Sequence, residues 1–162
     1  MQHPRHHPVG SIGGGRLNLV ARGVADHRLT GHAGVGEVVE GLALVSPDGF
    51  SARYDLDRVT GRISRESHAL YGASIAGKVL VCPIAKGGFA TSWALFDLRS
   101  RGLAPVAMLF TWANPVMVQG AVLAGVALMD QLSPDAMEAI RTGDRVRVDP
   151  KAGRVEVIRR AQ

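Results

Sequence analysis

The sequence contains a single cysteine, Cys82, and this scarcity excludes several kinds of site. One thiol cannot form an internal disulfide, and zinc or iron–sulfur sites need several ligands. Cys82 lies inside an apolar run, which indicates a small buried side chain. We therefore expect this chain to hold no metal and no cofactor of its own.

Aromatic residues and long apolar runs are also scarce. Because aromatics make up only 5% of the 162 residues, Val, Ala, Leu and Ile must fill the interior of a chain long enough for one domain. No apolar run approaches the roughly 18 residues that a membrane-spanning helix needs, and the N-terminal residues lack the apolar centre of a signal peptide. We expect a cytoplasmic protein with no membrane partner.

An excess of positive charge occurs only at the two ends of the chain. The formal net charge is +5, of which residues 1–30 contribute +3 and Arg159 and Arg160 contribute +2. Residues 31–156 carry thirteen basic and thirteen acidic side chains. A nucleic-acid surface needs a basic face, often interleaved with aromatics, and this neutral body offers none. We expect no nucleic-acid partner.

The first fifteen residues contain three His, two Pro and four Gly, a composition typical of a flexible extension. Nothing in that segment would fix His side chains around a metal. Beyond it, residues 16–162 show no repeat and no linker, and they predict a single mixed α/β domain. The alternation of apolar and polar residues from Arg16 to Val24 predicts its first strand.

The most informative stretch is Lys78–Trp93, which reads KVLVCPIAKGGFATSW. Its apolar first half, up to Ile84, predicts a buried strand, and Ala85–Gly88 predicts a sharp turn because glycine tolerates positive φ. Phe89–Leu98 predicts a helix, with aromatic residues at spacings of four and three. The stretch is therefore a strand, a glycine turn and a helix.

Such a turn directs free backbone N–H groups and the positive end of a helix toward one point, which suits a small anion. The Lys86 ammonium adds a charge, and Lys86, Gly87 and Gly88 are therefore candidate substrate-binding residues. The hydroxyls of Thr91 and Ser92 lie close by in the sequence. The alternative is a tight connection with no ligand, since many strand-to-helix turns contain two glycines.

Further strands and helices follow from periodicity and capping signals. Two strands joined through a helix form a right-handed parallel unit, which places the turn at the carboxyl edge of the sheet, where ligands of α/β sheets bind. Pro115–Ala124 is apolar nearly all round, which predicts a buried helix. The other predicted elements are strands at Glu37–Ser46, Ala104–Thr111 and Val126–Met129, a helix that starts at Ser133-Pro134-Asp135 and ends at Gly143, and a hairpin over Gly143–Ile158.

The polar segment from Phe50 to Gly72 shows no helical or strand period. A long irregular segment inside a compact domain is either functional or a set of short extended pieces. Within it, Ser51, Arg53, Asp57 and His68 are candidate substrate-binding residues, and the alternative for each is a solvated surface position. No metal-ligand spacing accompanies its acidic residues, so we expect no metal there.

Several motifs together resemble one known family. They are EGLALVS, DxxTG at Asp57–Gly61, HALYGxSIAGKVLVCPxxKGG, LAPVAMLF and ANPVMVQGAVLAGVALMD, and they cover about Gly36 to Asp130. The chain resembles the small subunit, or swivel domain, of aconitase X. This resemblance implies a swivelling β/β/α fold like the fourth domain of aconitase, and a large partner subunit that holds an iron–sulfur cluster.

The resemblance also implies an activity, which is the dehydration of a hydroxy acid by a hydro-lyase that needs both subunits. Cis-3-hydroxy-L-proline is the first choice of substrate, and mevalonate 5-phosphate is the alternative. In the family, the turn reads glycine, basic residue, glycine, serine, and the serine is taken as the proton acceptor. Gly88 stands at that position here, and we hypothesise that Ser92 or Thr91 is the catalytic substitute or binds the substrate carboxylate.

Two other readings stay open. The first is a mobile phosphohistidine carrier domain, whose turn and closing hairpin look similar, although Trp93 stands where that domain has its histidine and indole cannot accept a phosphoryl group in that way. The second is a non-catalytic swivel domain that binds a carboxylate or phosphate without a catalytic partner.

Overall fold

The computed structural model describes residues 27–162, so the extension predicted over residues 1–15 and the strand predicted over Arg16–Val24 lie outside it. In the described part, seven strands form one sheet in the order β1-β9-β8-β2-β5-β6-β7, and β3 and β4 form a separate ribbon. The strands are β1 (Arg28–Thr30), β2 (Val39–Val45), β3 (Leu56–Asp57), β4 (Arg62–Ile63), β5 (Val79–Ile84), β6 (Ala107–Trp112), β7 (Ala127–Asp130), β8 (Arg145–Asp149) and β9 (Arg154–Arg159), and the helices are α2 (Phe89–Ser100), α3 (Pro115–Ala124) and α4 (Ala136–Ala139).

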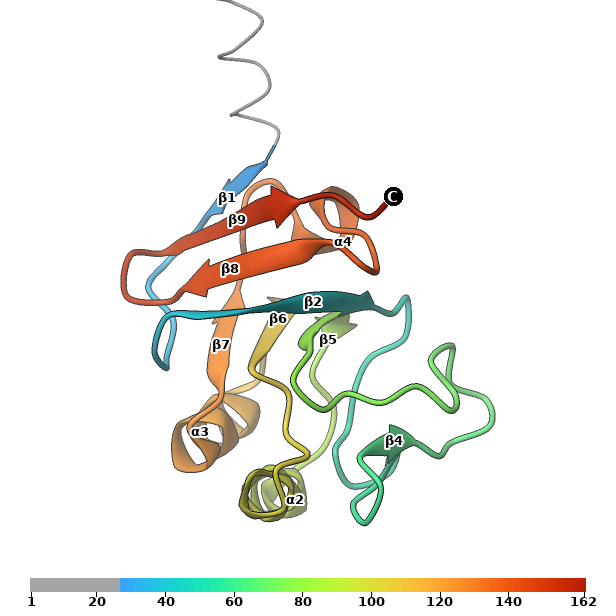
Figure 1. Ribbon diagram of the computed structural model, residues 1–162. Helices are drawn as coiled ribbons and strands as arrows, with labels where there is room; N and C mark the ends of the chain where they lie inside the picture. The colour runs from blue at the N-terminus through green and yellow to red at the C-terminus, as the bar shows by residue number, and fades with distance from the viewer. Residues whose placement is uncertain (1–26) are drawn as a thin grey trace, which may run out of the picture.

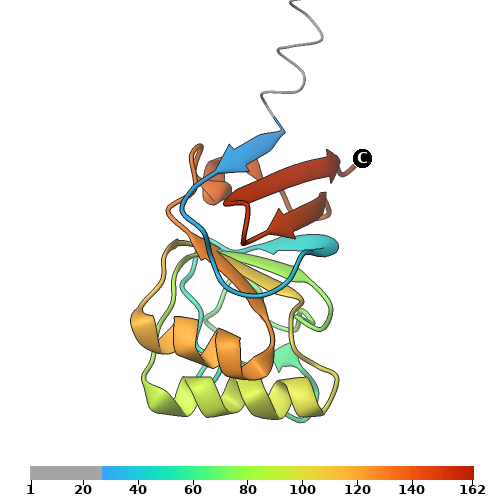
Figure 2. The same ribbon diagram turned by 90° about the vertical axis from the view of Figure 1, so that its left-hand side faces the viewer.

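The elements form three layers (Figure 1). Strands β2, β5, β6 and β7 pair in parallel, and β2 continues antiparallel into the hairpin β8–β9 and then β1, which curl over one face. Helices α2 and α3 cover the other face and lie side by side (Figure 2). This is the predicted β/β/α arrangement.

Strand β5 is buried on both faces, as expected for a parallel strand between two layers. Leu80 and Cys82 belong to the core shared with α2 and α3, whereas Val79 and Val81 belong to the core shared with β8 and β9. None of these four side chains is exposed to solvent. The first exposed side chain of β5 is Ile84, at its carboxyl end, so this strand can contribute to a ligand site only there.

The predicted elements of the central unit are confirmed. Strand β5, helix α2 and strand β6 follow one another as expected, and β5 and β6 pair in parallel. The closing hairpin is also present as β8 and β9. The segment between β2 and β5 is mostly irregular, with the two-residue strands β3 and β4 as its short extended pieces.

Two helix predictions are wrong in part. Helix α3 has the predicted bounds, but Val122 and Leu123 are 58% and 53% exposed, because only one side of the helix packs against the sheet and α2. Helix α4 ends at Ala139 rather than near Gly143. Ile140 already has extended backbone and a buried side chain, since the chain must turn there into β8. Within residues 27–162, no helix has the length and apolarity to cross a bilayer.

Asp144 is fully buried just before β8 and fixes the C-terminal end of the chain to the sheet. Its carboxylate accepts hydrogen bonds from the backbone N–H groups of Arg141 (2.9 Å) and Ala161 (2.8 Å), and it pairs with Arg160 Nη1 at 2.8 Å. Burial acts to raise the pKa of Asp144, but these hydrogen bonds and the Arg160 charge together lower it below the usual value for aspartate.

We predict that Asp144→Asn lowers the free energy of unfolding at pH 7 by about 2 kcal/mol, because a charge-assisted network is broken in the interior. Since the folded pKa is lowered, the contribution of Asp144 is present above the unfolded pKa of about 3.9 and disappears as the pH falls through the folded value. The difference between variant and wild type in urea unfolding should therefore shrink toward pH 3.

The control is Glu37→Gln, which removes an ion pair with Lys151 (3.0 Å) whose side chains are 81% and 71% exposed. We expect it to change the free energy of unfolding by less than about 0.5 kcal/mol. Equal losses for the two variants would contradict the role given to Asp144.

Candidate functional site

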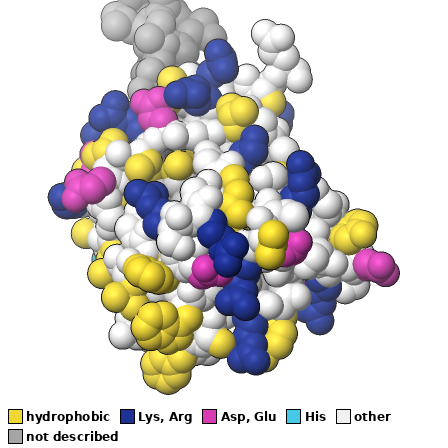
Figure 3. All heavy atoms as spheres, turned by 60° about the horizontal axis from the view of Figure 1, so that its bottom comes forward, with side chains coloured by type: hydrophobic (Ala, Val, Ile, Leu, Met, Phe, Trp, Pro, Cys, Tyr) yellow, Lys and Arg dark blue, Asp and Glu magenta, His cyan; other side chains and the backbone are white. Residues whose placement is uncertain are grey.

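The helix-bearing side of the molecule displays a row of Lys and Arg side chains beside hydrophobic ones (Figure 3). The turn that was singled out from the sequence lies on this side, between β5 and α2. Because β5 pairs in parallel with both β2 and β6, the turn is at the carboxyl edge of the parallel strands, as predicted.

Two backbone hydrogen bonds fix the turn to the chain that follows β2. The Phe50 N–H donates to the Ile84 carbonyl (3.0 Å), and the Lys86 N–H donates to the Phe50 carbonyl (2.8 Å). The chain immediately after Phe50 is thereby held next to the turn. Polar residues from two distant parts of the sequence meet at this point.

Two buried hydroxyls lie directly beneath Gly87. Ser51 Oγ and Thr91 Oγ1 are 3.5 Å apart, and each side chain is only 2% exposed. Gly87 has φ +104°, and a Cβ at this position would overlap Thr91 Oγ1 and lie 3.2 Å from Ser51 Oγ. Only glycine meets both conditions, so the turn can close over the two hydroxyls only with Gly87.

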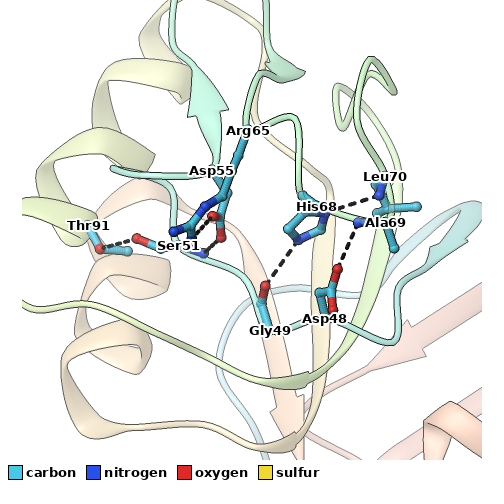
Figure 4. Close-up of polar contacts among 9 residues, drawn as sticks. All are labelled: Asp48, Gly49, Ser51, Asp55, Arg65, His68, Ala69, Leu70 and Thr91. Carbon is cyan, nitrogen blue, oxygen red and sulfur yellow. Dashed lines mark hydrogen bonds and ion pairs between the residues drawn. The ribbon is translucent and has the colours of Figure 1, made fainter.

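A buried carboxylate supports this arrangement from behind. Asp55 is 0% exposed, and its carboxylate accepts the Ser51 N–H (2.9 Å) and pairs with Arg65 Nη1 (3.0 Å). Figure 4 shows the resulting chain of contacts from Arg65 through Asp55 and Ser51 to Thr91. Arg65 is half exposed, so the N–H groups that do not face Asp55 remain available to a ligand.

A polar pocket of about 170 Å³ opens beside the turn. Within residues 27–162, the Lys86 ammonium forms no ion pair with an acidic side chain. The aliphatic part of the Lys86 side chain packs over Gly49, where a Cβ would lie only 2.9 Å from Lys86 Cε. The pocket is lined by Asp48, Gly49, Arg65, Ser67, His68 and Lys86.

His68 lines this pocket, but both of its ring nitrogens are engaged within the chain (Figure 4). Nδ1 accepts the Leu70 N–H (3.1 Å), so Nε2 carries the proton and donates it to the Gly49 carbonyl (3.1 Å). Beside it, Asp48 Oδ2 accepts the Ala69 N–H at 2.7 Å. His68 therefore shapes the pocket wall and does not present a free nitrogen to a ligand.

Three other predicted site residues do not face this pocket. The Ser92 hydroxyl is buried and donates to the Val116 carbonyl of α3 (2.9 Å), so it fills the space between the two helices. Arg53 stacks on Tyr54, with its guanidinium 5.2 Å from the ring centroid. The third residue is Asp57, whose carboxylate accepts hydrogen bonds within its own turn.

Asp57 accepts the Val59 N–H (2.9 Å) and the Thr60 hydroxyl (3.0 Å), and these contacts, the Val59 hydrogen bond first, lower the pKa of Asp57. Its position in the DxxTG motif is thus explained by the local turn, which ends at Gly61 with φ +70°. Of the predicted site residues, Lys86 and His68 line the pocket. Ser51 and Thr91 lie beneath Gly87 in the adjoining turn, and Gly88 completes that turn.

Sequence reasoning missed Asp48 and Arg65 as pocket residues and Asp55 as the buried support. The available signal was the concentration of charge between residues 48 and 68. No period in that segment indicates which charged side chains point inward, and only the fold separates Asp55, which is buried, from Asp57, which is not.

Cys82 lies in β5 behind the turn and is fully buried, as predicted. Burial, with smaller effects of the Asp55 and Asp48 charges, raises the pKa of the Cys82 thiol to about 12. It is therefore protonated at neutral pH and is neither a nucleophile nor a metal ligand in the folded chain. Among residues 27–162, no three His, Cys, Asp or Glu side chains are grouped as metal ligands, so these residues do not fit an iron–sulfur cluster.

We predict that Gly87→Ala lowers the free energy of unfolding by about 1 to 3 kcal/mol, because it forces a side chain into positive φ and against Thr91. The matched control is Gly88→Ala, since Gly88 has φ −113° and a Cβ added there would meet no atom within 4 Å. Urea unfolding measures both variants, and a similar loss in each would contradict the account of Gly87.

The comparisons with known proteins agree with this fold. A family model described as the aconitase X swivel domain matches residues 28–157. The phosphomevalonate dehydratase small subunit of Methanocella arvoryzae is 37% identical over 130 residues, which cover 80% of this chain and 98% of that protein. The phosphomevalonate dehydratase small subunit of Pyrococcus horikoshii is 35% identical over 126 residues, covering 77% and 92%.

The crystal structure of Thermococcus kodakaraensis aconitase X in its holo-form includes a chain with the same fold. The TM-score is 0.76 at 32% sequence identity, and the match covers 81% of this chain and 98% of that one. The predicted swivel fold and the predicted resemblance are both confirmed. The chain belongs to the aconitase X swivel-domain family, which it shares with small subunits of dehydratases.

Proposed function

We propose that this chain is the small subunit of a two-subunit dehydratase and that its Lys86 pocket holds an acid group of a hydroxy-acid substrate. The main support is the Lys86 ammonium, which has no acidic partner within residues 27–162 and lines a polar pocket at the carboxyl edge of the parallel strands. Family membership supports the reaction class.

Loss of water from a hydroxy acid needs donors for the acid group, a base for the proton and a Lewis acid at the leaving hydroxyl. Lys86 and the free N–H groups of Arg65 provide the donors, and Asp55 holds Arg65 in place. The Lewis acid belongs, in this proposal, to a large partner subunit with an iron–sulfur cluster. This chain would then be inactive alone, and a cytoplasmic location stays a prediction.

Mevalonate 5-phosphate is the substrate that we propose. The relatives named above are phosphomevalonate dehydratase small subunits, and they favour it over cis-3-hydroxy-L-proline, which the sequence resemblance put first. Mevalonate 5-phosphate carries a carboxylate and a phosphate, and the pocket contains two cations, Lys86 and Arg65. One observation favours cis-3-hydroxy-L-proline as a second candidate, namely Asp48, whose carboxylate could pair with the ring ammonium of that substrate.

Gly88 stands where the family has its serine, and packing does not account for the difference. Gly88 has ordinary backbone angles and open space around its Cβ position, and as the N-cap of α2 it provides no side-chain hydrogen bond. A serine there would fit and would cap the helix. With Ser92 turned toward α3, we propose that Thr91, paired with Ser51, provides the hydroxyl on this chain. Thr91 and Ser51 are each 2% exposed beneath Gly87, so in this proposal Thr91 reaches the substrate only when the turn over it shifts.

The proposal is tested by reconstitution with the large subunit of an aconitase X from the same organism. We expect dehydration of mevalonate 5-phosphate by the mixture and by neither subunit alone, with cis-3-hydroxy-L-proline assayed in parallel. Lys86→Met should lower kcat/KM by about 100-fold, since a contact to a charged group is worth up to about 3 kcal/mol. The control is Lys78→Met at the opposite end of β5, for which we expect no change.

A second experiment tests the hydroxyl. Thr91→Val keeps the side-chain volume and should lower kcat by about 100-fold or more, as expected for loss of a proton-transfer group. Gly88→Ser in the Thr91→Val background should restore part of the activity, because it returns a hydroxyl to the same turn. Unchanged kcat in Thr91→Val would remove Thr91 from the mechanism and leave the proposed reaction class intact.

A further inference from the structure

This chain has few aromatic residues and exposes most of them. It contains four Phe, two Trp and two Tyr. Only two of these eight side chains, Phe50 and Phe110, are buried in the core. The other six are between 48% and 71% exposed, and they include both tryptophans. A single exposed apolar side chain is normal, but aromatic side chains are usually mostly buried, and here six of the eight are exposed.

Three of the six form one ridge along α2. Phe89, Trp93 and Phe96 are spaced as i, i+4 and i+7 and are 71%, 67% and 48% exposed. The Trp93 and Phe96 rings meet edge to face, with centroids 6.4 Å apart. The opposite side of the helix carries Leu95 and Leu98 into the core, so the aromatic ridge (Phe89, Trp93 and Phe96) points away from the sheet.

Basic side chains outnumber acidic ones in the part of the chain that contains the aromatic ridge. Residues 50–103 contain eight Lys or Arg side chains and four Asp or Glu side chains, and basic side chains gather beside hydrophobic ones on this face (Figure 3). Two of the arginines, Arg58 and Arg101, share the single acid of α2, Asp97, at 3.9 Å and 3.1 Å. A complementary surface therefore has an apolar centre and an acidic rim.

A second copy of this chain does not meet that description, because two such faces would bring like charges together. The position of the ridge indicates the occupant. Phe89 follows Gly88 directly, so the ridge begins where the glycine turn ends. A subunit that closes over the Lys86 pocket also reaches Phe89.

We infer that the aromatic ridge is the docking surface for the large subunit of the proposed dehydratase. The inference rests on the proposed function for the identity of the partner. It adds that Trp93 is the central anchor of the interface, and that the partner presents an apolar patch with acidic residues around it. Interfacial tryptophans that fill a partner's pocket commonly dominate the binding free energy.

The test is the affinity between the purified chain and the large subunit, measured by calorimetry, with activity measured on the same samples. Trp93→Ala should weaken association by about 30-fold or more, and the double variant Phe89→Ala/Trp93→Ala should weaken it further. Association should also weaken with salt, because the rim is charged. The control is Ile158→Ala, an apolar truncation of similar exposure (49%) on β9 at the other end of the sheet.

The outcomes separate the two claims. If Trp93→Ala binds as tightly as wild type while the wild-type mixture dehydrates its substrate, the docking surface is wrong and the proposed function stands. If the wild-type chain neither binds the large subunit nor acts with it, the proposed function fails and the inference fails with it.

Two other occupants of the ridge would also overturn the inference. They are a second copy of this chain and a vesicle of anionic lipid, if the wild-type chain binds either one and Trp93→Ala does not. Thermal unfolding of Trp93→Ala should match wild type, because the side chain is mostly exposed.

Discussion

The site depends on the contact between the Gly87 backbone and the Thr91 hydroxyl. Strand β5 is closed to solvent on both faces, so its chemistry has to come from the residues just beyond its end. A residue with positive φ at position 87 lets the chain reverse over the Ser51 and Thr91 hydroxyls and begin α2 two residues later. With any side chain at this position, the turn would have to move away, and the direction of Lys86 would change with it.

Two buried aspartates use the same interactions for different purposes. Asp55 and Asp144 are both 0% exposed, and each pairs with one arginine. The Asp55 carboxylate also accepts one backbone N–H group, and that of Asp144 accepts two. A buried carboxylate needs such compensation, because its desolvation is costly. The arginine of Asp144 anchors the C-terminal end, whereas Arg65 remains half exposed and lines the pocket. Asp55 thus helps to order the irregular segment and also holds Arg65 at the pocket.

The order of elements could be predicted from the sequence because it follows from local signals. Apolar runs predicted β5 and β6, and the Asn114-Pro115 cap predicted the start of α3. The alternation of apolar and polar residues predicted the hairpin. The length of α4 could not be predicted, because the helix ends before Ile140, which has extended backbone and a side chain buried in the core. The exposure of α3 likewise depends on which of its sides meets α2.

The site was only half predictable, for a related reason. Glycines and a lysine in a turn are visible in one segment, so Lys86, Gly87 and Gly88 could be proposed from the sequence. The partners from residues 48–68 reach the turn through the backbone pairing of Phe50 with Ile84 and Lys86, which has no sequence pattern. Ser92 was misleading because helical spacing alone does not distinguish the side that faces the turn from the side that faces α3.

The aromatic ridge and the Lys86 pocket strengthen one another if one partner covers both. Two unit charges 4 Å apart attract by about 1 kcal/mol in bulk water and by about 4 kcal/mol at the effective dielectric of a protein surface. An open pocket with a partly exposed lysine therefore holds an anion weakly. In the proposed complex, a subunit docked on Phe89 and Trp93 would exclude water from the adjacent turn, and the attraction between Lys86 and an acid group would rise accordingly. In this proposal, the coupling accounts for the position of Phe89 directly after the cationic turn.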